Sequence, residues 1–324
     1  MSYRVLITDQ PWSNSDIERA ILEPVGCELI EAPDGDEETL IELARDVDAI
    51  ATCWAHVTAN VIEAAQNCKH IARLGIGLDN IDLTAATDRG IPVTNVPDYC
   101  VNEVADHALG LLLACARNIA YFHLRTKRGE YDLKAGPTMT RLSEQTLGLV
   151  GFGRIARNLR EKAMALGLTV IAHSRSGNDY GTGCEMVSFE QLLARSDYVS
   201  VHAPLSVETE QMFDVATLSK MKQNACLINT SRGGLVDEKA LLMALRMERL
   251  RMVALDVFRP EPPDLSQPLF CHERVIVTPH AAFVSEQAVR ELRKRVARQV
   301  LDVLQKRRPE HIVNPEVWTD AHEP

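Results

Sequence analysis

TLGLVGFGRIA, residues 146–156, carries the most informative local pattern of the sequence. It places the pattern G-x-G-x-x-A directly after a strand-like run and at the start of a helix-like run. Gly151 allows a tight turn, Gly153 lets an anion approach the backbone, and Ala156 keeps the helix close to the strand. In this context the segment predicts a dinucleotide-binding turn with a pyrophosphate at the helix N-terminus. A turn of small residues that binds nothing is the alternative.

Strand-like runs alternate with helix-like runs on both sides of this turn. The runs after it are LTVIAHS (168–174), YVSVHAPL (198–205), ACLINTS (225–231), MVALDVF (252–258) and RVIVTPH (274–280), and those before it are YRVLITD (3–9), CELIEA (27–32), VDAIATC (47–53), HIARLG (70–75) and IPVTNV (91–96). Such alternation predicts parallel sheets covered by helices on both faces. Because 324 residues are enough for two cores, we expect an α/β protein of two doubly wound parallel-sheet domains.

The composition is that of a soluble globular protein, and it narrows the range of partners. A net charge of −10 argues against nucleic acid or an anionic membrane as the main partner. No apolar run reaches the roughly 18 residues that span a bilayer, and the first residues do not form a signal-peptide pattern. The eight cysteines are scattered without a C-x-x-C pair, which is typical of reduced thiols. We therefore expect a cytoplasmic protein without a metal site.

Two long helical runs stand out from this alternation. Val101–Asn118 is too apolar around its circumference for an ordinary surface helix, so we expect it to be buried between domains or against another subunit. Ser285–Lys306 is a long charged helix near the C-terminus. It could return to the first domain.

The strand that follows the predicted dinucleotide-binding turn ends with the sequence His173-Ser174-Arg175-Ser176. An acidic residue at this position would bind the 2′-hydroxyl of the adenosine ribose, whereas a basic residue can accept a 2′-phosphate. No acid is present. Ser174 and Arg175 therefore favour NADP, with NAD as the other option, unless Arg175 is simply a solvated surface residue.

Three later strand ends carry charged residues that could converge. Arg232 lies in INTSRGGLVD (228–237), Glu261 in ALDVFRPEP (254–262), and His280 in VTPHA (277–281). The carboxyl ends of parallel strands face the ligand crevice. Each residue alone has an ordinary structural explanation, but together, beside a dinucleotide turn, they predict an acid–base site.

With these motifs in this order and spacing, the chain resembles the D-isomer-specific 2-hydroxyacid dehydrogenases over nearly its whole length. RLGIGLDNIDL (73–83) and VPDYCVNEVADHALGLLL (96–113) add matches outside the three strand ends. The resemblance implies a flavodoxin-like substrate domain, residues 1–97 and 285–324, with a Rossmann cofactor domain, residues 98–284, inserted in it. It also implies a homodimer formed largely by the cofactor domains.

The resemblance implies that Arg232, Glu261 and His280 are the catalytic residues. Arg232 would clamp the substrate carboxylate and polarise the neighbouring carbonyl. His280 would donate a proton to the carbonyl oxygen as hydride leaves C4 of the reduced nicotinamide, and Glu261 would stabilise the imidazolium. The expected reaction interconverts a small D-2-hydroxy acid and its 2-oxo acid.

The resemblance also assigns binding residues. The backbone of Ile76 and Gly77 is expected to receive the substrate carboxylate, and Asp256 the nicotinamide carboxamide. The full set of expected cofactor contacts is Gly151, Gly153, Arg154, Ile155, Ser174, Arg175, Ala203, Pro204, Thr230 and Asp256.

The end of the third strand bears on the size of the substrate. The family members that act on phosphoglycerate share an Arg at this position. This chain has Thr52 there, and the bulky Trp54 lies two residues later. A phosphate dianion needs charge-assisted hydrogen bonds to offset its desolvation. We therefore expect a small unphosphorylated acid such as glyoxylate or hydroxypyruvate, with Arg73 and His56 as the residues that could replace the missing Arg.

Two other functions share these motifs. One is a co-repressor-like binding module that senses dinucleotide and binds partner peptides without turnover. The other is a dehydrogenase that oxidises formate or phosphite. Turnover of 2-oxo acids would separate the expected enzyme from the binding module.

Overall fold

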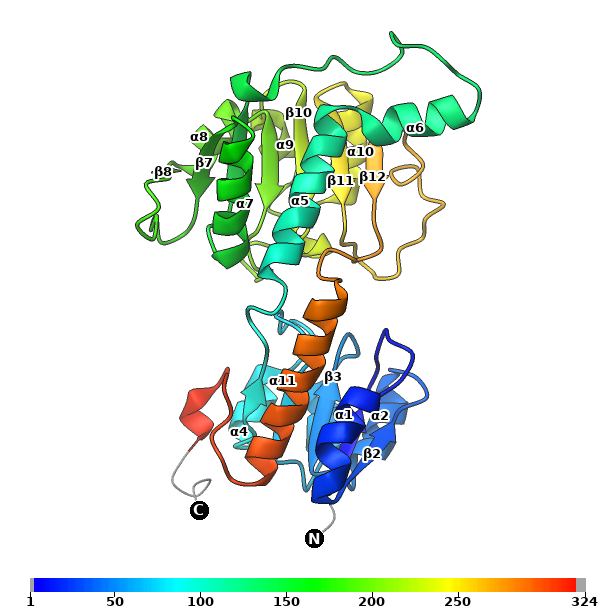
Figure 1. Cartoon of the computed structure of the whole chain (residues 1–324), viewed down its shortest axis with the longest axis vertical. Helices are drawn as coiled ribbons and strands as arrows, with labels where there is room; N and C mark the ends of the chain where they lie inside the picture. Colours follow the sequence, from blue (N-terminus) through cyan, green and yellow to red (C-terminus); the bar gives the residue numbers. More distant parts are fainter. Residues whose placement is uncertain (1–2, 319–324) are drawn as a thin grey trace. The chain divides into compact units, whose positions relative to one another are not determined.

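A computed structural model describes residues 3–318, which form two compact units (Figure 1). One unit runs to Tyr99 and resumes at Ser285, and the other is Cys100–Val284. Each has its own sheet, in which all strand pairs are parallel, and its own apolar core. The predicted α/β class with two doubly wound sheets is confirmed.

The first unit has a five-stranded sheet in the order β2-β1-β3-β4-β5, which is the flavodoxin-like order. Its elements are β1 (Tyr3–Ile7), α1 (Asp16–Leu22), η1 (Glu23–Val25), β2 (Cys27–Glu31), α2 (Glu37–Ala44), β3 (Ala49–Thr52), α3 (Ala59–Ala64), β4 (His70–Arg73), α4 (Leu83–Asp88), β5 (Val93–Thr94), α11 (Glu286–Leu304) and η4 (Pro315–Val317). Residues of β3 and β4 are buried throughout, because helices cover both faces of the sheet.

Helix α11 belongs to this unit although it comes last in the chain. The Ser285 side chain caps it by accepting a hydrogen bond from the N–H of Ala288 at 2.9 Å. The buried Arg293 guanidinium donates to both carboxylate oxygens of Glu18 on α1, at 2.8 and 2.6 Å. Such a bidentate pair fixes the position of α11 against α1, and it satisfies two charges that would otherwise be costly to bury.

The second unit has a seven-stranded sheet in the order β12-β11-β10-β9-β6-β7-β8, which contains the Rossmann strand order with one more strand. Its elements are α5 (Val101–Ala116), α6 (Ile119–Lys127), η2 (Leu142–Glu144), β6 (Thr146–Val150), α7 (Arg154–Ala165), β7 (Thr169–His173), β8 (Glu185–Met186), α8 (Phe189–Arg195), β9 (Tyr198–Val201), α9 (Val215–Lys220), β10 (Ala225–Asn229), η3 (Gly233–Leu235), α10 (Glu238–Arg246), β11 (Leu250–Leu255) and β12 (Val275–Val277).

The apolar run 101–118 is one helix only as far as Ala116. Asn118 has a left-handed backbone with φ of 52°, and α6 starts after it. The buried residues of α5 pack in the same core as β6, β10 and β11 of this unit. Asp106 and Gly110 are exposed in the single chain, and the burial of α5 between domains or against another subunit stays a prediction.

Candidate active site

The turn between β6 and α7 has a shape that only glycine fits at its first position. Gly151 has φ of 90°, and its N–H donates to the carbonyl of His173 at 2.8 Å. A Cβ on Gly151 would lie 2.6 Å from the carbonyl carbon of His202 and 2.7 Å from the nitrogen of Ala203. The predicted tight turn is therefore set both by backbone conformation and by contact with the segment after β9.

The start of α7 leaves room for an anion. Gly153 is the N-cap of this 12-residue helix and provides no side-chain cap, and a Cβ added to it would meet no atom within 4 Å. Ala156 is fully buried against the sheet. Arg154 is exposed and Ile155 half-buried in the first turn. Backbone N–H groups at a helix start with open space beside them fit the pyrophosphate of a dinucleotide.

The ends of β9 and β10 are joined by a side-chain contact. The hydroxyl of Ser231 donates to the carbonyl of Ala203 at 2.7 Å, which holds the two strand ends together beside Pro204. Thr230 is buried, and its hydroxyl has no hydrogen-bond partner among the described residues. Because buried polar atoms are normally satisfied, this hydroxyl fits a site that a polar cofactor group completes.

Ser174 and Arg175 follow β7 at the predicted ribose position. Arg175 is exposed, and the hydroxyls of Ser174 and Ser176 are 3.4 Å apart. A hydrogen bond from Ser206, with a smaller contribution from the charge of Arg175, lowers the pKa of Glu208. Arg175 therefore lies near the segment that follows β9.

Glu261 and His280 are in direct contact. Nδ1 of His280 is 2.7 Å from one carboxylate oxygen of Glu261, and the other oxygen accepts the N–H of Phe258 at 2.8 Å. Burial raises the pKa of Glu261, but the hydrogen bond and charge of His280, the Phe258 N–H and the charge of Arg232 together lower it below its usual value. Glu261 is thus held as a carboxylate that faces the imidazole.

Arg232 lies in the loop after β10, which closely approaches the loop that carries Glu261. A Cβ on the next residue, Gly233, would lie 2.1 Å from the carbonyl carbon of Phe258. The Arg232 carbonyl accepts a hydrogen bond from Asn229 at 2.8 Å. The motifs did not single out Gly233. The pair of glycines after Arg232 could have indicated that another backbone segment comes close at this point.

Asp256 has a structural role that the motif analysis did not foresee. Its carboxylate is fully buried, and it accepts hydrogen bonds from the hydroxyl of Thr278 at 2.6 Å and from the N–H groups of Ala281 and Ala282, both at 2.9 Å. These contacts hold the segment around His280, which itself has φ of 51°. Asp256 therefore positions the His280 segment.

His107 was also missed by the motif analysis. Its Nε2 is 3.0 Å from the hydroxyl of Thr278 and 3.5 Å from Asp256. A polar ring in the apolar VADHALG run on α5 was the signal that could have found it. His107 thus supports the same segment from the helix side.

The predicted substrate loop of the first unit is fixed by side chains. Arg73, at the end of β4, donates to the carbonyl of Gly77 at 2.9 Å and to that of Leu74 at 2.5 Å. Asn95 donates to the carbonyl of Ile76 at 2.8 Å. The Arg73 guanidinium is therefore engaged with the loop that the motifs assign to the substrate carboxylate.

The neighbouring strand end presents little positive charge. Thr52 is fully buried and donates to the carbonyl of Ala55 at 2.8 Å. Trp54 and His56 are both exposed in the loop that follows. No residue in this loop reproduces a guanidinium at the position of Thr52.

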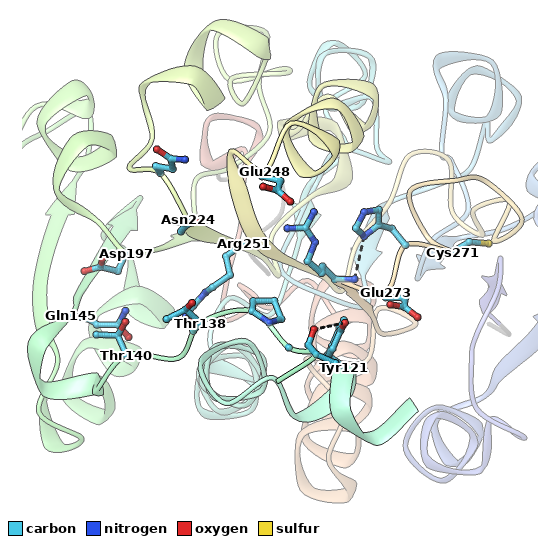
Figure 2. A pocket seen from close by; sticks show the side chains of 16 residues that line it. Tyr121, Thr138, Thr140, Gln145, Asp197, Asn224, Glu248, Arg251, Cys271 and Glu273 are labelled. Carbon is cyan, nitrogen blue, oxygen red and sulfur yellow. Dashed lines mark hydrogen bonds between the residues drawn. The ribbon is translucent and has the colours of Figure 1, made fainter. Parts of the chain in front are cut away.

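A pocket of about 960 Å³ lies at the amino ends of the strands of the second sheet (Figure 2). Several of its lining residues lie at the amino ends of strands, as Gln145 precedes β6, Asp197 precedes β9 and Arg251 is the second residue of β11. The pocket is therefore separate from the predicted site residues, which follow the strands. Between residues 3 and 318, no helix is long and apolar enough to cross a membrane, and no group of three or more His, Cys, Asp or Glu side chains could hold a metal ion.

The chain is similar to known proteins in both sequence and structure. Residues 109–282 match the family model for the NAD-binding domain of D-isomer specific 2-hydroxyacid dehydrogenases. The chain is 38% identical over 316 residues to a D-3-phosphoglycerate dehydrogenase of Methanocaldococcus jannaschii, and the match covers 96% of this chain but 59% of that protein. A glyoxylate reductase of Thermococcus litoralis is 38% identical over 292 residues, covering 87% of this chain and 88% of the relative.

Among solved structures, an acyclic imino acid reductase in complex with NADPH and D-arginine superimposes with a TM-score of 0.85 at 28% identity. The superposition covers 96% of this chain and 99% of that chain. The chain therefore spans about three fifths of the phosphoglycerate dehydrogenase relative and nearly all of the other two proteins.

Proposed function

Because the chain belongs to the D-isomer-specific 2-hydroxyacid dehydrogenase family, we propose that it is an enzyme that interconverts a small unphosphorylated 2-oxo acid and its D-2-hydroxy acid, with NADP(H) as the preferred cofactor. The observation that carries the proposal is the contact of 2.7 Å between His280 and Glu261, at the carboxyl ends of strands in a sheet with a dinucleotide turn. An imidazole held by a carboxylate is suited to moving a proton near neutral pH.

The side chains divide the chemistry among them. The reduced nicotinamide, when bound, supplies the hydride. Arg232 binds the substrate carboxylate with its planar guanidinium and polarises the adjacent carbonyl. Nδ1 of His280 is held by Glu261, so Nε2 is the atom that gives a proton to the carbonyl oxygen and takes it back in the oxidation direction.

The preference for NADPH is supported by the residues that follow β7. Arg175 provides an exposed guanidinium where an acid would repel a 2′-phosphate, and Ser174 adds a hydroxyl beside it. The structural relative that is in complex with NADPH, at 28% identity, supports this preference.

The preference for an unphosphorylated substrate is supported by the first unit. Thr52 is buried and bonded to a backbone carbonyl, so it offers no charge to a phosphate. Arg73 is engaged with the carbonyls of Leu74 and Gly77, so using it for a phosphate would release the loop it holds. Glyoxylate and hydroxypyruvate fit this site better than a phosphorylated acid.

The test is a panel of 2-oxo acids assayed with NADH and with NADPH by nicotinamide absorbance. We expect higher catalytic efficiency for hydroxypyruvate than for phosphohydroxypyruvate, and Arg175→Ala is expected to raise the KM for NADPH much more than that for NADH. A tenfold advantage for the phosphorylated acid, about 1.4 kcal/mol of transition-state binding, would overturn the substrate assignment. More efficient use of NADH by the unmodified enzyme would overturn the cofactor assignment. A stable partner protein with no turnover of any acid would favour the binding module.

A further inference from the structure

A charged side chain enters the apolar core of the second unit at a β-bulge. The pairing of β10 with β11 shifts between Ala225 and Cys226, which face Leu250 and Met252, so Arg251 is the extra residue of β11. Bulges of this kind redirect a side chain. Arg251 is 5% exposed although a guanidinium is costly to bury without an anion.

Two of the four hydrogen bonds of the Arg251 guanidinium go to a sulfur atom. Its Nε and Nη2 donate to Sγ of Cys226 at 3.3 and 3.2 Å. Nη2 also reaches the hydroxyl of Tyr198 at 3.0 Å, and Nη1 donates to the carbonyl of Thr138 at 3.0 Å. Within residues 3–318, no carboxylate forms an ion pair with Arg251, so Cys226 is the group placed to carry the compensating charge.

A second thiol lies beside the first. Cys115 on α5 and Cys226 on β10 are both fully buried in the same apolar core. Burial by itself raises the pKa of Cys226, but the hydrogen bond with Cys115 and the charge and hydrogen bonds of Arg251 lower it below the ordinary value of a thiol. The hydrogen bond with Cys226, together with burial, raises the pKa of Cys115. One sulfur thus favours the thiolate and its neighbour stays protonated.

Solvent comes close to this cluster through the pocket at the amino ends of the strands. Figure 2 shows Arg251 among the side chains that line the pocket, together with Thr138 and Gln145. Gln145 accepts a hydrogen bond from the hydroxyl of Tyr198 at 2.7 Å, so the pocket wall and the cluster share hydrogen bonds. Arg251 thus lines the pocket and also donates to Sγ of Cys226, so it connects the pocket wall with the thiol.

We propose that Cys226 is a peroxide-reactive site, activated by Arg251 and resolved by Cys115. The thiolate of Cys226 attacks one oxygen of hydrogen peroxide. An S–O bond forms, the O–O bond breaks, and hydroxide leaves and is protonated by solvent. The sulfur of Cys115 then attacks the sulfenic sulfur; an S–S bond forms, and the departing hydroxyl takes the Cys115 proton as water. Two thiols lose two electrons, and the peroxide is reduced to two waters.

The experiment uses the full chain carrying Cys271→Ser, because Cys271 is the exposed thiol and would react first. The folded protein is exposed to hydrogen peroxide, digested without reduction and analysed by mass spectrometry. The expected product is a peptide pair joined by a Cys115–Cys226 disulfide. With Cys115→Ser added, a sulfenic acid at Cys226 should be trapped by a dimedone reagent.

Two buried thiols of the first unit serve as internal controls. Burial raises the pKa of Cys53 and of Cys68 to about 12; the charge of Arg73 and its hydrogen bond to Cys53 oppose this shift at Cys53 without cancelling it. Both should stay reduced while Cys226 is oxidised. Arg251→Met should slow the oxidation of Cys226 about tenfold or more, the effect of one pKa unit on the thiolate fraction.

Three results would overturn the proposal. The first is a Cys226 thiol that survives peroxide in the folded chain but reacts in urea. The second is oxidation of Cys53 or Cys68 as fast as that of Cys226, since that would report general opening of the protein. The third is a rate unchanged by Arg251→Met in a variant that keeps the unfolding temperature of its parent.

Discussion

Replacing Gly233 by Ala tests whether the close approach of two loops sets the geometry of the active site. The added Cβ would lie 2.1 Å from the carbonyl carbon of Phe258 and 2.2 Å from its oxygen. An ordinary contact starts at 3.4 Å, so the Phe258 backbone must retreat by about 1.3 Å, the difference between 3.4 and 2.1 Å. The Phe258 N–H holds Glu261 at 2.8 Å, so the shift reaches the partner of His280.

A misplacement of about 1 Å can cost on the order of a hundredfold in rate, and overpacking costs about 1–3 kcal/mol in stability. We therefore expect Gly233→Ala to lower kcat/KM for the best 2-oxo acid by about a hundredfold, and to lower the free energy of urea unfolding within that range. Gly234→Ala is the matched control, because the atoms nearest to its Cβ would be the ends of the Leu205 and Arg259 side chains, at 3.1 and 3.2 Å. Activity of Gly233→Ala within threefold of the control would refute the reasoning.

Three further changes test the same site. His280→Ala should lower kcat by about a hundredfold or more while cofactor affinity, measured by fluorescence titration, stays nearly constant; near-normal turnover would remove His280 from the mechanism. The pKa of Glu261 is lower in the folded protein than its value of about 4.3 in the unfolded chain, so the ionised carboxylate stabilises the folded state. This stabilisation is complete above the unfolded pKa, and it is lost as the pH falls through the lower folded pKa. Glu261→Gln should therefore lose stability relative to the unmodified protein at neutral pH but not at acidic pH, and a pH-independent difference in unfolding free energy would contradict this. His107→Phe keeps a ring but loses the contact with Thr278, so kcat should fall by up to about tenfold, the value of one hydrogen bond, and an unchanged kcat would show that the contact is dispensable.

The sequence predicted those features that depend on short stretches of chain. The tight turn at Gly151 and the strand-then-helix pattern around it are local, and so both sheets and their parallel strands could be anticipated. The family motifs also brought Glu261 and His280 together as candidates, and the structure places them in contact.

Features that depend on distant partners could not be predicted in this way. Asp256 accepts hydrogen bonds from residues 22 to 26 positions later, and no local pattern reports which groups will fill its oxygens. The break between α5 and α6 has neither Gly nor Pro to mark it, because the left-handed residue there, Asn118, is an Asn. Arg251 lies just before the strand-like run 252–258, so nothing in the alternation of the sequence marks the bulge that it forms.

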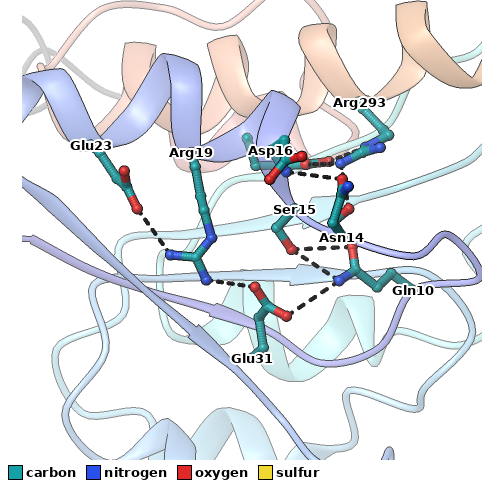
Figure 3. A network of polar contacts seen from close by, with 9 residues as sticks. Gln10, Asn14, Ser15, Asp16, Arg19, Glu23, Glu31 and Arg293 are labelled. Atoms are coloured by element: carbon teal, nitrogen blue, oxygen red, sulfur yellow. Dashed lines mark hydrogen bonds and ion pairs between the residues drawn. The ribbon is translucent and has the colours of Figure 1, made fainter.

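The return of α11 to the first unit has a consequence for biosynthesis. Glu18 and Arg293 are 275 residues apart in the chain (Figure 3 shows Arg293 beside the start of α1). At about 5–20 residues per second, a ribosome needs roughly a quarter of a minute to a minute to make the second after the first. Throughout that interval Glu18 lacks the charge of Arg293, and β3 and β4 lack the cover that α11 provides. Cys100–Val284, in contrast, is contiguous and can fold as soon as it emerges. The nascent first unit is therefore the segment that needs protection from aggregation, and a fragment that stops before Ser285 should show cooperative unfolding of the second unit alone.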